Sequence, residues 1–111
     1  MHELSISRNI VEIATEHAQG QAIARIRLAV GELSCVMPEA LHFCFDAVRR
    51  DTVLANAQLD IERVAGRARC QDCGAEFALP VGGARCSCGA IRHEILQGEE
   101  LKIVEIEFDQ E

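Results

Sequence analysis

Two short cysteine loops, Cys70-Gln71-Asp72-Cys73-Gly74 and Cys86-Ser87-Cys88-Gly89, decide the fold of the segment that contains them. Zinc prefers four tetrahedral donors, and two loops that supply two thiolates each meet this requirement. Loops of this kind separated by a hairpin-length segment predict a zinc ribbon. The ligands that we predict for a structural zinc ion are Cys70, Cys73, Cys86 and Cys88.

Other interpretations of the four cysteines are buried thiols, a disulfide-bonded hairpin, or rubredoxin-like iron bound to four thiolates. The chain start has neither the basic segment nor the apolar segment of a signal peptide, so we expect a cytoplasmic protein. Thiols stay reduced in the cytosol, which favours metal ligation over disulfides. Four thiolates also leave no open position for a water nucleophile, so the zinc is expected to be structural.

The ribbon has few large apolar residues from which to build a core. They are Phe77, Leu79, Val81, Ile91 and Ile95. We therefore expect metal binding to supply most of its folding free energy, on the order of 10 kcal/mol as in zinc-finger peptides.

The residues before the ribbon alternate between helical and strand patterns. Apolar residues at helical spacing predict a helix over 5–19, with Ser5 or Ser7 as its N-cap and Gly20 after its end. The predicted inward face of this helix carries Ile6, Ile10, Ile13 and Ala14, and Val11 and Ala18 widen it.

A strand with alternating apolar residues is expected at 25–30, and Pro38 suits the first position of a second helix. That helix has its buried stripe at Leu41, Cys44, Phe45 and Val48. Strands follow at 59–64 and 101–108. The apolar phase of the latter shifts between Ile103 and Val104, which predicts either a bulge or burial on both faces.

The predicted fold class is α+β, with two helices packed on a small mixed or antiparallel sheet and an inserted zinc-ribbon module. We expect one domain from residues 1–66 plus 100–111 and a zinc-ribbon domain from residues 67–99. The composition of the 111 residues, with 49% hydrophobic and 26% charged residues, excludes a disordered chain or a coiled coil. No stretch is long and apolar enough for a membrane helix.

Charge is distributed unevenly along this acidic chain, whose formal net charge is −7. Residues 67–99 carry four basic and four acidic side chains, while residues 100–111 carry one basic and five acidic ones. The ribbon thus lacks a phosphate-neutralising patch, and the chain has no Tyr or Trp for base stacking. For these reasons no nucleic acid partner is expected. A zinc-ribbon nucleic-acid-binding or transcription accessory protein is kept only as the second-ranked hypothesis of function.

His2 follows the initiator Met1, so that a free amine and an imidazole are adjacent. With the backbone amides of His2 and Glu3 they can form a compact nitrogen chelate, and square-planar nitrogen donors suit Ni(II) or Cu(II). Such binding weakens on acidification, because protons compete for the amine and the imidazole. The alternative is a histidine at a frayed chain end with no metal.

The remaining histidines and cysteines have ordinary interpretations. His17 suits the C-terminal end of the first helix, His42 is expected in solvent, and Cys44 is a small apolar residue of the second helix. Cys35 lies in a predicted loop. His93 follows the second cysteine loop and either approaches the zinc or lies on a strand surface.

Several motifs in this order resemble one known family. They are Met1-His2-Glu3-Leu4-Ser5, Val30-Gly31-Glu32-Leu33-Ser34, Phe43-Cys44-Phe45-Asp46, the two cysteine loops, and Gly98-Glu99-Glu100-Leu101 leading into Ile106-Glu107. Together they resemble the HypA/HybF family of hydrogenase maturation factors, which are nickel metallochaperones. The second loop is C-x-C where many members have C-x2-C.

The resemblance implies nickel bound by the Met1 amine, the His2 side chain and the backbone of His2 and Glu3, and a structural zinc at the four cysteines. It implies delivery of nickel for [NiFe]-hydrogenase maturation, with a hydrogenase maturation GTPase and the hydrogenase large-subunit precursor as partners. The protein is then not an enzyme, and it is a monomer or homodimer.

A third hypothesis of function is a metal-dependent enzyme or redox protein that uses the cysteine pairs. The sequence shows no glycine-rich phosphate loop, no serine nucleophile motif and no convincing carboxylate pair for catalysis. Asp60, Glu62, Glu105 and Glu107 alternate with apolar residues, which is typical of a solvated sheet face.

Overall fold

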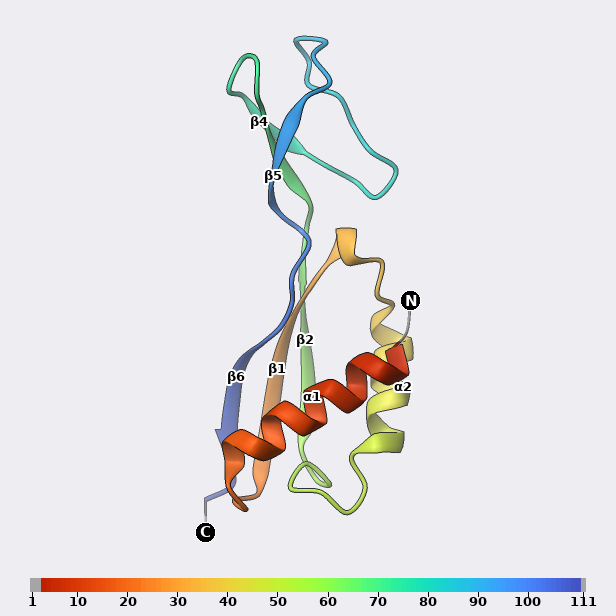
Figure 1. Cartoon of the computed structure of the whole chain (residues 1–111), viewed down its shortest axis with the longest axis vertical. Helices are drawn as coiled ribbons and strands as arrows, with labels where there is room; N and C mark the ends of the chain where they lie inside the picture. The colour runs from red at the N-terminus through yellow and green to blue at the C-terminus, as the bar shows by residue number, and fades with distance from the viewer. Residues whose placement is uncertain (1–2, 111) are drawn as a thin grey trace.

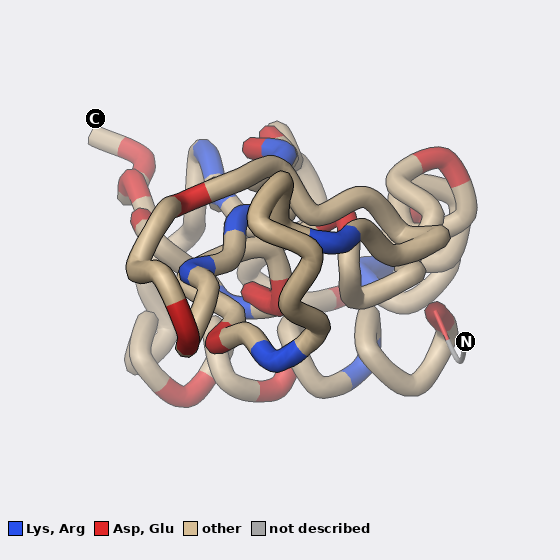
Figure 2. The backbone as a smooth tube through the Cα atoms, turned by 90° about the horizontal axis from the view of Figure 1, so that it is seen from above, with Lys and Arg blue, Asp and Glu red and all other residues tan. Residues whose placement is uncertain are grey.

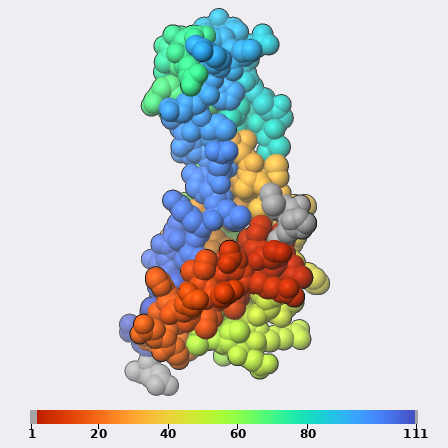
Figure 3. Space-filling view, viewed as in Figure 1, coloured from red at the N-terminus to blue at the C-terminus, as the bar shows by residue number. Residues whose placement is uncertain are grey.

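The computed structural model describes residues 3–110, which form an elongated molecule of 56 × 24 × 17 Å. Figure 1 shows two helices and one sheet at one end of the long axis and a second, smaller sheet at the other. We call residues 3–66 and 100–110 the body and residues 67–99 the ribbon. In the space-filling view, the ribbon projects from the body as a narrower lobe (Figure 3).

The first helix, α1 (Glu3–Ala18), begins two residues earlier than the sequence predicts. The predicted cap at Ser5 or Ser7 is therefore wrong, since both lie inside the helix. Ser7 is fully buried instead, and its hydroxyl donates a hydrogen bond of 3.5 Å to the carbonyl oxygen of Leu41 in the second helix. The prediction for Ile13 is also wrong, because this residue is 47% exposed, whereas Val11 is buried as predicted.

The body sheet has the strand order β2-β1-β6, with β1 (Ile23–Gly31) in the centre. β2 (Gln58–Val64) runs parallel to β1, and β6 (Leu101–Phe108) runs antiparallel to it, so the sheet is mixed. The register shifts where Arg27 pairs with Glu105 and Leu28 with Ile103, which leaves Val104 as the predicted bulge.

Between β1 and β2 the chain forms a 3-10 turn, η1 (Glu32–Ser34), and then α2 (Pro38–Val48). Pro38 stands in the first turn as predicted, where its missing N–H costs nothing. Leu41 and Phe45 are buried, whereas Cys44 is only partly buried. The core between the helices and the sheet is formed chiefly by Ile10, Ala14, Ile26, Leu28, Val30, Leu41, Phe45 and Leu54.

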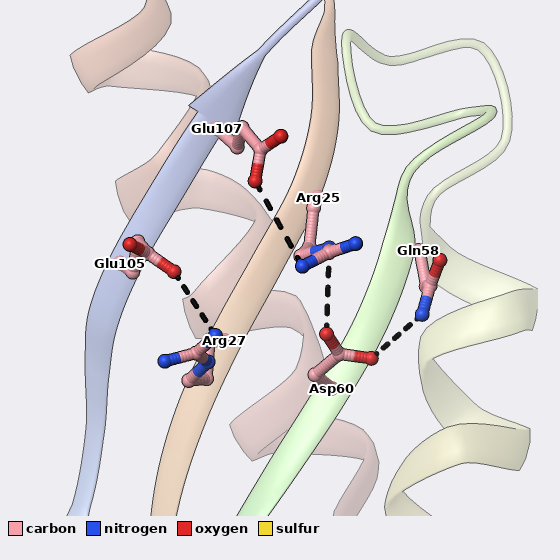
Figure 4. Close-up of polar contacts among 6 residues, drawn as sticks. All are labelled: Arg25, Arg27, Gln58, Asp60, Glu105 and Glu107. Atoms are coloured by element: carbon pink, nitrogen blue, oxygen red, sulfur yellow. Dashed lines mark hydrogen bonds and ion pairs between the residues drawn. The ribbon is translucent and has the colours of Figure 1, made fainter.

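The other face of the body sheet is covered by charged side chains that alternate in sign across the strands (Figure 4). Arg25 and Arg27 of β1 lie between acidic residues of the two outer strands. The ion pairs are Arg25–Asp60 at 3.4 Å, Arg25–Glu107 at 3.9 Å and Arg27–Glu105 at 3.4 Å. All are at least partly exposed to solvent, so each contributes about 0–1 kcal/mol, and this face is the solvated one.

The ribbon sheet has the order β4-β3-β5, with both outer strands antiparallel to the central one. Its strands are β3 (Arg67–Cys70), β4 (Glu76–Ala78) and β5 (His93–Gln97). These strands lie between β2 and β6 in the sequence, as expected for an inserted module. That the two sheets belong to separate domains with the boundaries given above stays a prediction.

The body and the ribbon meet where three glycines approach one another closely. The Gly31 N–H donates to the Glu100 carbonyl oxygen at 2.7 Å, and the Leu33 N–H donates to that of Gly98 at 2.8 Å. A Cβ atom at Gly31 would lie 1.9 Å from the Gly98 carbonyl oxygen, and one at Gly98 would lie 2.6 Å from the Gly66 Cα. The two chain crossings therefore require glycine, and the side chain of Leu33 lies against this junction.

Candidate metal centre

The four ribbon cysteines are positioned by strand ends and tight turns. Cys70 is the last residue of β3, and the Gly74 N–H closes the first loop by donating to the Cys70 carbonyl oxygen at 3.0 Å. The second loop is closed in the same way, by the Gly89 N–H and the Cys86 carbonyl oxygen at 2.9 Å. Both glycines have positive φ values, 80° and 90°, a backbone conformation that glycine adopts without steric cost and that allows each tight turn.

The sulfur atoms of these two loops converge on one point. All four lie within 4.8 Å of one another, and this is the only potential metal-binding group of His, Cys, Asp and Glu side chains found among residues 3–110. The Sγ–Sγ distance is 3.5 Å between Cys73 and Cys86 and 3.7 Å between Cys70 and Cys88. A disulfide requires about 2.05 Å, so these contacts are not disulfides, and all six cysteines are free.

The spacing of the sulfurs fits tetrahedral zinc. With Zn–S bonds of about 2.3 Å, a regular tetrahedron has sulfurs about 3.8 Å apart, close to the 3.5 and 3.7 Å between the two sulfur pairs given above. The shortened second loop, Cys86-Ser87-Cys88, still presents both of its sulfurs to the first loop. Cys70, Cys73, Cys86 and Cys88 are thus positioned to bind a zinc ion, as the sequence predicts.

The ionisation of the cluster depends on backbone amides and on neighbouring thiols. The backbone N–H groups of Cys73 and Asp72 favour the thiolate of Cys70 and lower its pKa to about 7. The N–H of Ala90 favours the thiolate of Cys88, but the thiols of Cys86 and Cys70 outweigh it and raise that pKa to about 12. A cation is therefore needed before all four sulfurs can be thiolates together near neutral pH.

His93 does not join the cluster. It lies in β5 opposite Cys70, and its ring stands edge-on to Phe77 with centroids 5.8 Å apart. Its Nδ1 atom lies 3.2 Å from the Ile91 carbonyl oxygen. Of the two interpretations of His93, the strand-surface one is therefore the one that the structure supports.

The apolar core of the ribbon is small, as the sequence predicts. Leu79 is buried, but Val81, Ile91 and Ile95 are 63%, 67% and 40% exposed. A sheet with strands of three to five residues has little volume to enclose, so the expectation that the ribbon lacks a large core is confirmed.

The predicted nickel ligands Met1 and His2 lie outside the described residues. Glu3, the third, is the first residue of α1, and its carboxylate accepts a hydrogen bond of 3.3 Å from the Met37 backbone N–H. This contact joins residues 34 positions apart and has no signature in the sequence, so sequence analysis missed it. It ties the start of α1 to the loop before α2.

The other singled-out residues lie away from the cluster. Cys35 is exposed after η1 with a φ of 62°, and His17 and His42 are exposed on α1 and α2.

Viewed along the long axis, Lys and Arg positions are scattered among Asp and Glu positions rather than gathered on one side (Figure 2). The nucleic-acid alternative is therefore not favoured. Within residues 3–110, no helix has the length and apolarity needed to cross a membrane.

Fold and site together define a class: a small α+β protein that carries a four-cysteine, zinc-ribbon metal centre. Comparison with known proteins narrows this class. Residues 1–108 match the family model described as "Hydrogenase/urease nickel incorporation, metallochaperone, hypA". The chain belongs to this HypA family of nickel metallochaperones.

Similar proteins agree with this assignment. A hydrogenase maturation factor HypA from a Nostoc species is 47% identical over 99% of this chain and 97% of its own. One from Geotalea uraniireducens is 46% identical over 98% and 100%. The solution structure of the Ni metallochaperone HypA from Helicobacter pylori is 26% identical and matches with a TM-score of 0.71, covering all of both chains.

Proposed function

We propose that this protein carries Ni(II) as cargo at the start of its chain and delivers it for [NiFe]-hydrogenase maturation. The ligands are the Met1 amine, the His2 imidazole, and the backbone amides of His2 and Glu3. Four nitrogen donors in one plane suit Ni(II), and this geometry discriminates against zinc, which prefers a tetrahedron. A ligand set at a chain start is open to exchange, which a carrier needs in order to release its cargo.

The observation that carries the proposal is the family match over residues 1–108, which includes the Met-His-Glu start. The structure adds support at Glu3. Because the Glu3 carboxylate holds the Met37 N–H and α1 begins at this residue, the proposed site adjoins a fixed backbone position. The ribbon, which contains the four cysteines, lies at the opposite end of the long axis from α1 and α2 (Figure 1), which supports a zinc site separate from the proposed nickel site.

Zinc has a structural role in this proposal. Cys70, Cys73, Cys86 and Cys88 would hold it, and a zinc ion bound to four thiolates supplies a rigid crosslink and no activated water. The two cysteine loops come together at that point, so the crosslink defines the shape of the ribbon. Neither metal site calls for a catalysed reaction, which is consistent with a metallochaperone that is not an enzyme.

The partners that we propose are a hydrogenase maturation GTPase and the hydrogenase large-subunit precursor, in the cytoplasm. The proposal is supported by relatives named hydrogenase maturation factors. The family description also includes urease. Transfer of nickel from the loaded protein to purified apo large-subunit precursor, compared with transfer to apo-urease, would distinguish these destinations.

Nickel titration of the untagged protein tests the cargo site. We expect an absorption band of square-planar Ni(II), which His2→Ala and a variant with residues added before Met1 both lose while their zinc content stays the same. His42→Ala is the matched control, because it removes an exposed histidine from α2. Nickel stoichiometry that is unchanged in both site variants would disprove a chain-start site.

A further inference from the structure

The four cysteines of the ribbon differ in their access to solvent. Cys73 of the first loop and Cys88 of the second are exposed. Cys70 and Cys86 are only 1% and 4% exposed. Each loop therefore contributes one exposed cysteine and one buried cysteine. Because a peroxide oxidises accessible cysteines first, the first oxidation at this centre is expected at one of the two exposed residues.

The sulfur contacts described above join an exposed cysteine of one loop to a buried cysteine of the other. The Sγ–Sγ distances are 3.5 Å for Cys73–Cys86 and 3.7 Å for Cys70–Cys88. A disulfide needs sulfurs about 2.05 Å apart, so each pair closes with about 1.5 to 1.7 Å of movement. An accessible cysteine beside a second cysteine that can resolve its oxidised form is the arrangement found in redox-sensitive sites.

Contacts outside the sulfur cluster hold the two loops against each other. The Gln71 N–H donates a hydrogen bond of 3.0 Å to the Arg92 carbonyl oxygen, and the Arg92 guanidinium lies 3.3 Å from a carboxylate oxygen of Asp72. The pairing of Cys70 with His93 between β3 and β5 continues this contact along the backbone. None of these contacts involves a sulfur atom, so they keep the loops adjacent while the sulfurs react.

We propose that this centre is a site of reversible oxidative modification, at which a peroxide converts the four thiolates into two disulfides between the loops. The pairs are Cys73–Cys86 and Cys70–Cys88. The exposed thiolate attacks a peroxide oxygen, so that an S–O bond forms, the O–O bond breaks and hydroxide leaves. The buried thiolate then attacks the oxidised sulfur, which forms the S–S bond and releases a second hydroxide. Each disulfide consumes one molecule of hydrogen peroxide, and its two sulfurs supply the two electrons.

The two disulfides replace zinc as the crosslink of the ribbon. Zinc binds thiolates, so it is released when the sulfurs are oxidised. Because both disulfides join the first loop to the second, the ribbon keeps its shape without the metal. A disulfide within either loop would also release zinc, but it would leave the loops unconnected.

The modification is confined to the ribbon and can be reversed. A dithiol reductant restores the thiolates by thiol–disulfide exchange, after which zinc binds again. The proposed nickel ligands at the chain start include no sulfur atom, so oxidation does not remove them. The oxidation state of the ribbon can therefore change while the chain start keeps its ligand set.

Treatment of the full-length, zinc-loaded protein with hydrogen peroxide tests the proposal, and a chromophoric chelator measures the zinc released. Trypsin cleaves after Arg69, Arg85 and Arg92. One peptide, residues 70–85, then holds both cysteines of the first loop, and the next, residues 86–92, holds both of the second. With free thiols blocked, we expect the two peptides to stay linked until dithiothreitol separates them. Tandem mass spectrometry assigns the pairs, and reduced protein should regain its zinc.

A second measurement and a matched control complete the test. Oxidised, zinc-free protein should keep the amide protection of β3 that reduced, chelated protein loses. Cys35→Ser removes the exposed cysteine outside the cluster, so it should change neither zinc release nor the linkage of the peptides. Tryptic peptides that are not linked, loss of β3 protection on oxidation, or products that dithiothreitol does not reduce would each overturn the proposal. Zinc that stays bound after Cys35 has been fully oxidised overturns it as well.

Discussion

The body and the ribbon are both small β-sheet structures, but they differ in what holds them together. The body encloses Ile26, Leu28, Leu41, Phe45 and Leu54, each at most 1% exposed, between two helices and a sheet. In the ribbon, the buried apolar residues are Ala68, Leu79, Cys70 and Cys86, of which the last two belong to the sulfur cluster. Burial in the ribbon is thus concentrated around a metal centre.

This difference in burial indicates that the two regions are stabilised by different interactions. A layer of helices over a sheet removes a large apolar area from water, at about 25 cal/mol per Å². A three-stranded sheet with no covering layer cannot do so and needs a crosslink. We therefore expect the two regions to respond oppositely to loss of metal and to loss of apolar contacts.

The largest effect is expected from removal of zinc. Chelation of the metal, or Cys70→Ser, should unfold the ribbon and leave the body folded, because metal binding contributes on the order of 10 kcal/mol to such modules. Amide hydrogen exchange measured residue by residue should show loss of protection in β3 and β5 and its retention in β1. Cys35→Ser, which changes an exposed thiol, is the control. Protection of β3 that survives chelation would show that the ribbon has a core of its own.

The second-largest effect on stability is expected from truncation of a side chain in the body core. Phe45→Ala should lower the free energy of unfolding of the body by about 3–5 kcal/mol, because it leaves a cavity beneath α2. Urea titration followed by circular dichroism measures this, and the zinc content should not change. Phe43→Ala removes an aromatic ring from the same helix at a position that is 77% exposed, so it should have little effect. Equal losses in the two variants would contradict the assignment of Phe45 to the core.

A smaller effect is expected at the junction of the two regions. Gly31→Ala introduces a Cβ that meets the Gly98 carbonyl oxygen, and the overpacking should cost about 1–3 kcal/mol. Gly82→Ala is the control, because a Cβ there meets nothing within 4 Å. If urea unfolding of Gly31→Ala separates into two transitions while the wild type shows one, the junction couples the regions. If Gly31→Ala had the same free energy of unfolding as the wild type, the close approach of the chain at Gly31 and Gly98 would be disproved.

Sequence analysis predicted the elements of the body well where one face is strongly apolar. The strand at 101–108 and its bulge are confirmed, since the phase shift at Val104 is a local property of the alternating pattern. The errors concern partners outside the local segment. Ser7 is buried and donates to the Leu41 carbonyl oxygen of α2, whereas Ile13 of the same helix is 47% exposed.

The candidate sites were predictable to different degrees. Ligand type and loop spacing identified Cys70, Cys73, Cys86 and Cys88, and the structure brings their sulfurs together even with the shortened second loop. His93 remained ambiguous in the sequence, because proximity along the chain does not determine the direction of a side chain in a strand. The nickel ligands at Met1 and His2 stay a prediction.

By itself, the sequence determined that the chain contains a four-cysteine ribbon inserted before the last strand of an α+β unit. That was possible because metal ligation and strand alternation are encoded over a few neighbouring residues. Only the tertiary structure decided that β6 lies at an open edge, that Gly31 and Gly98 cross in contact, and that Glu3 holds the loop at Met37. Each of these depends on residues far apart in the chain, whose proximity is set by packing of the whole core.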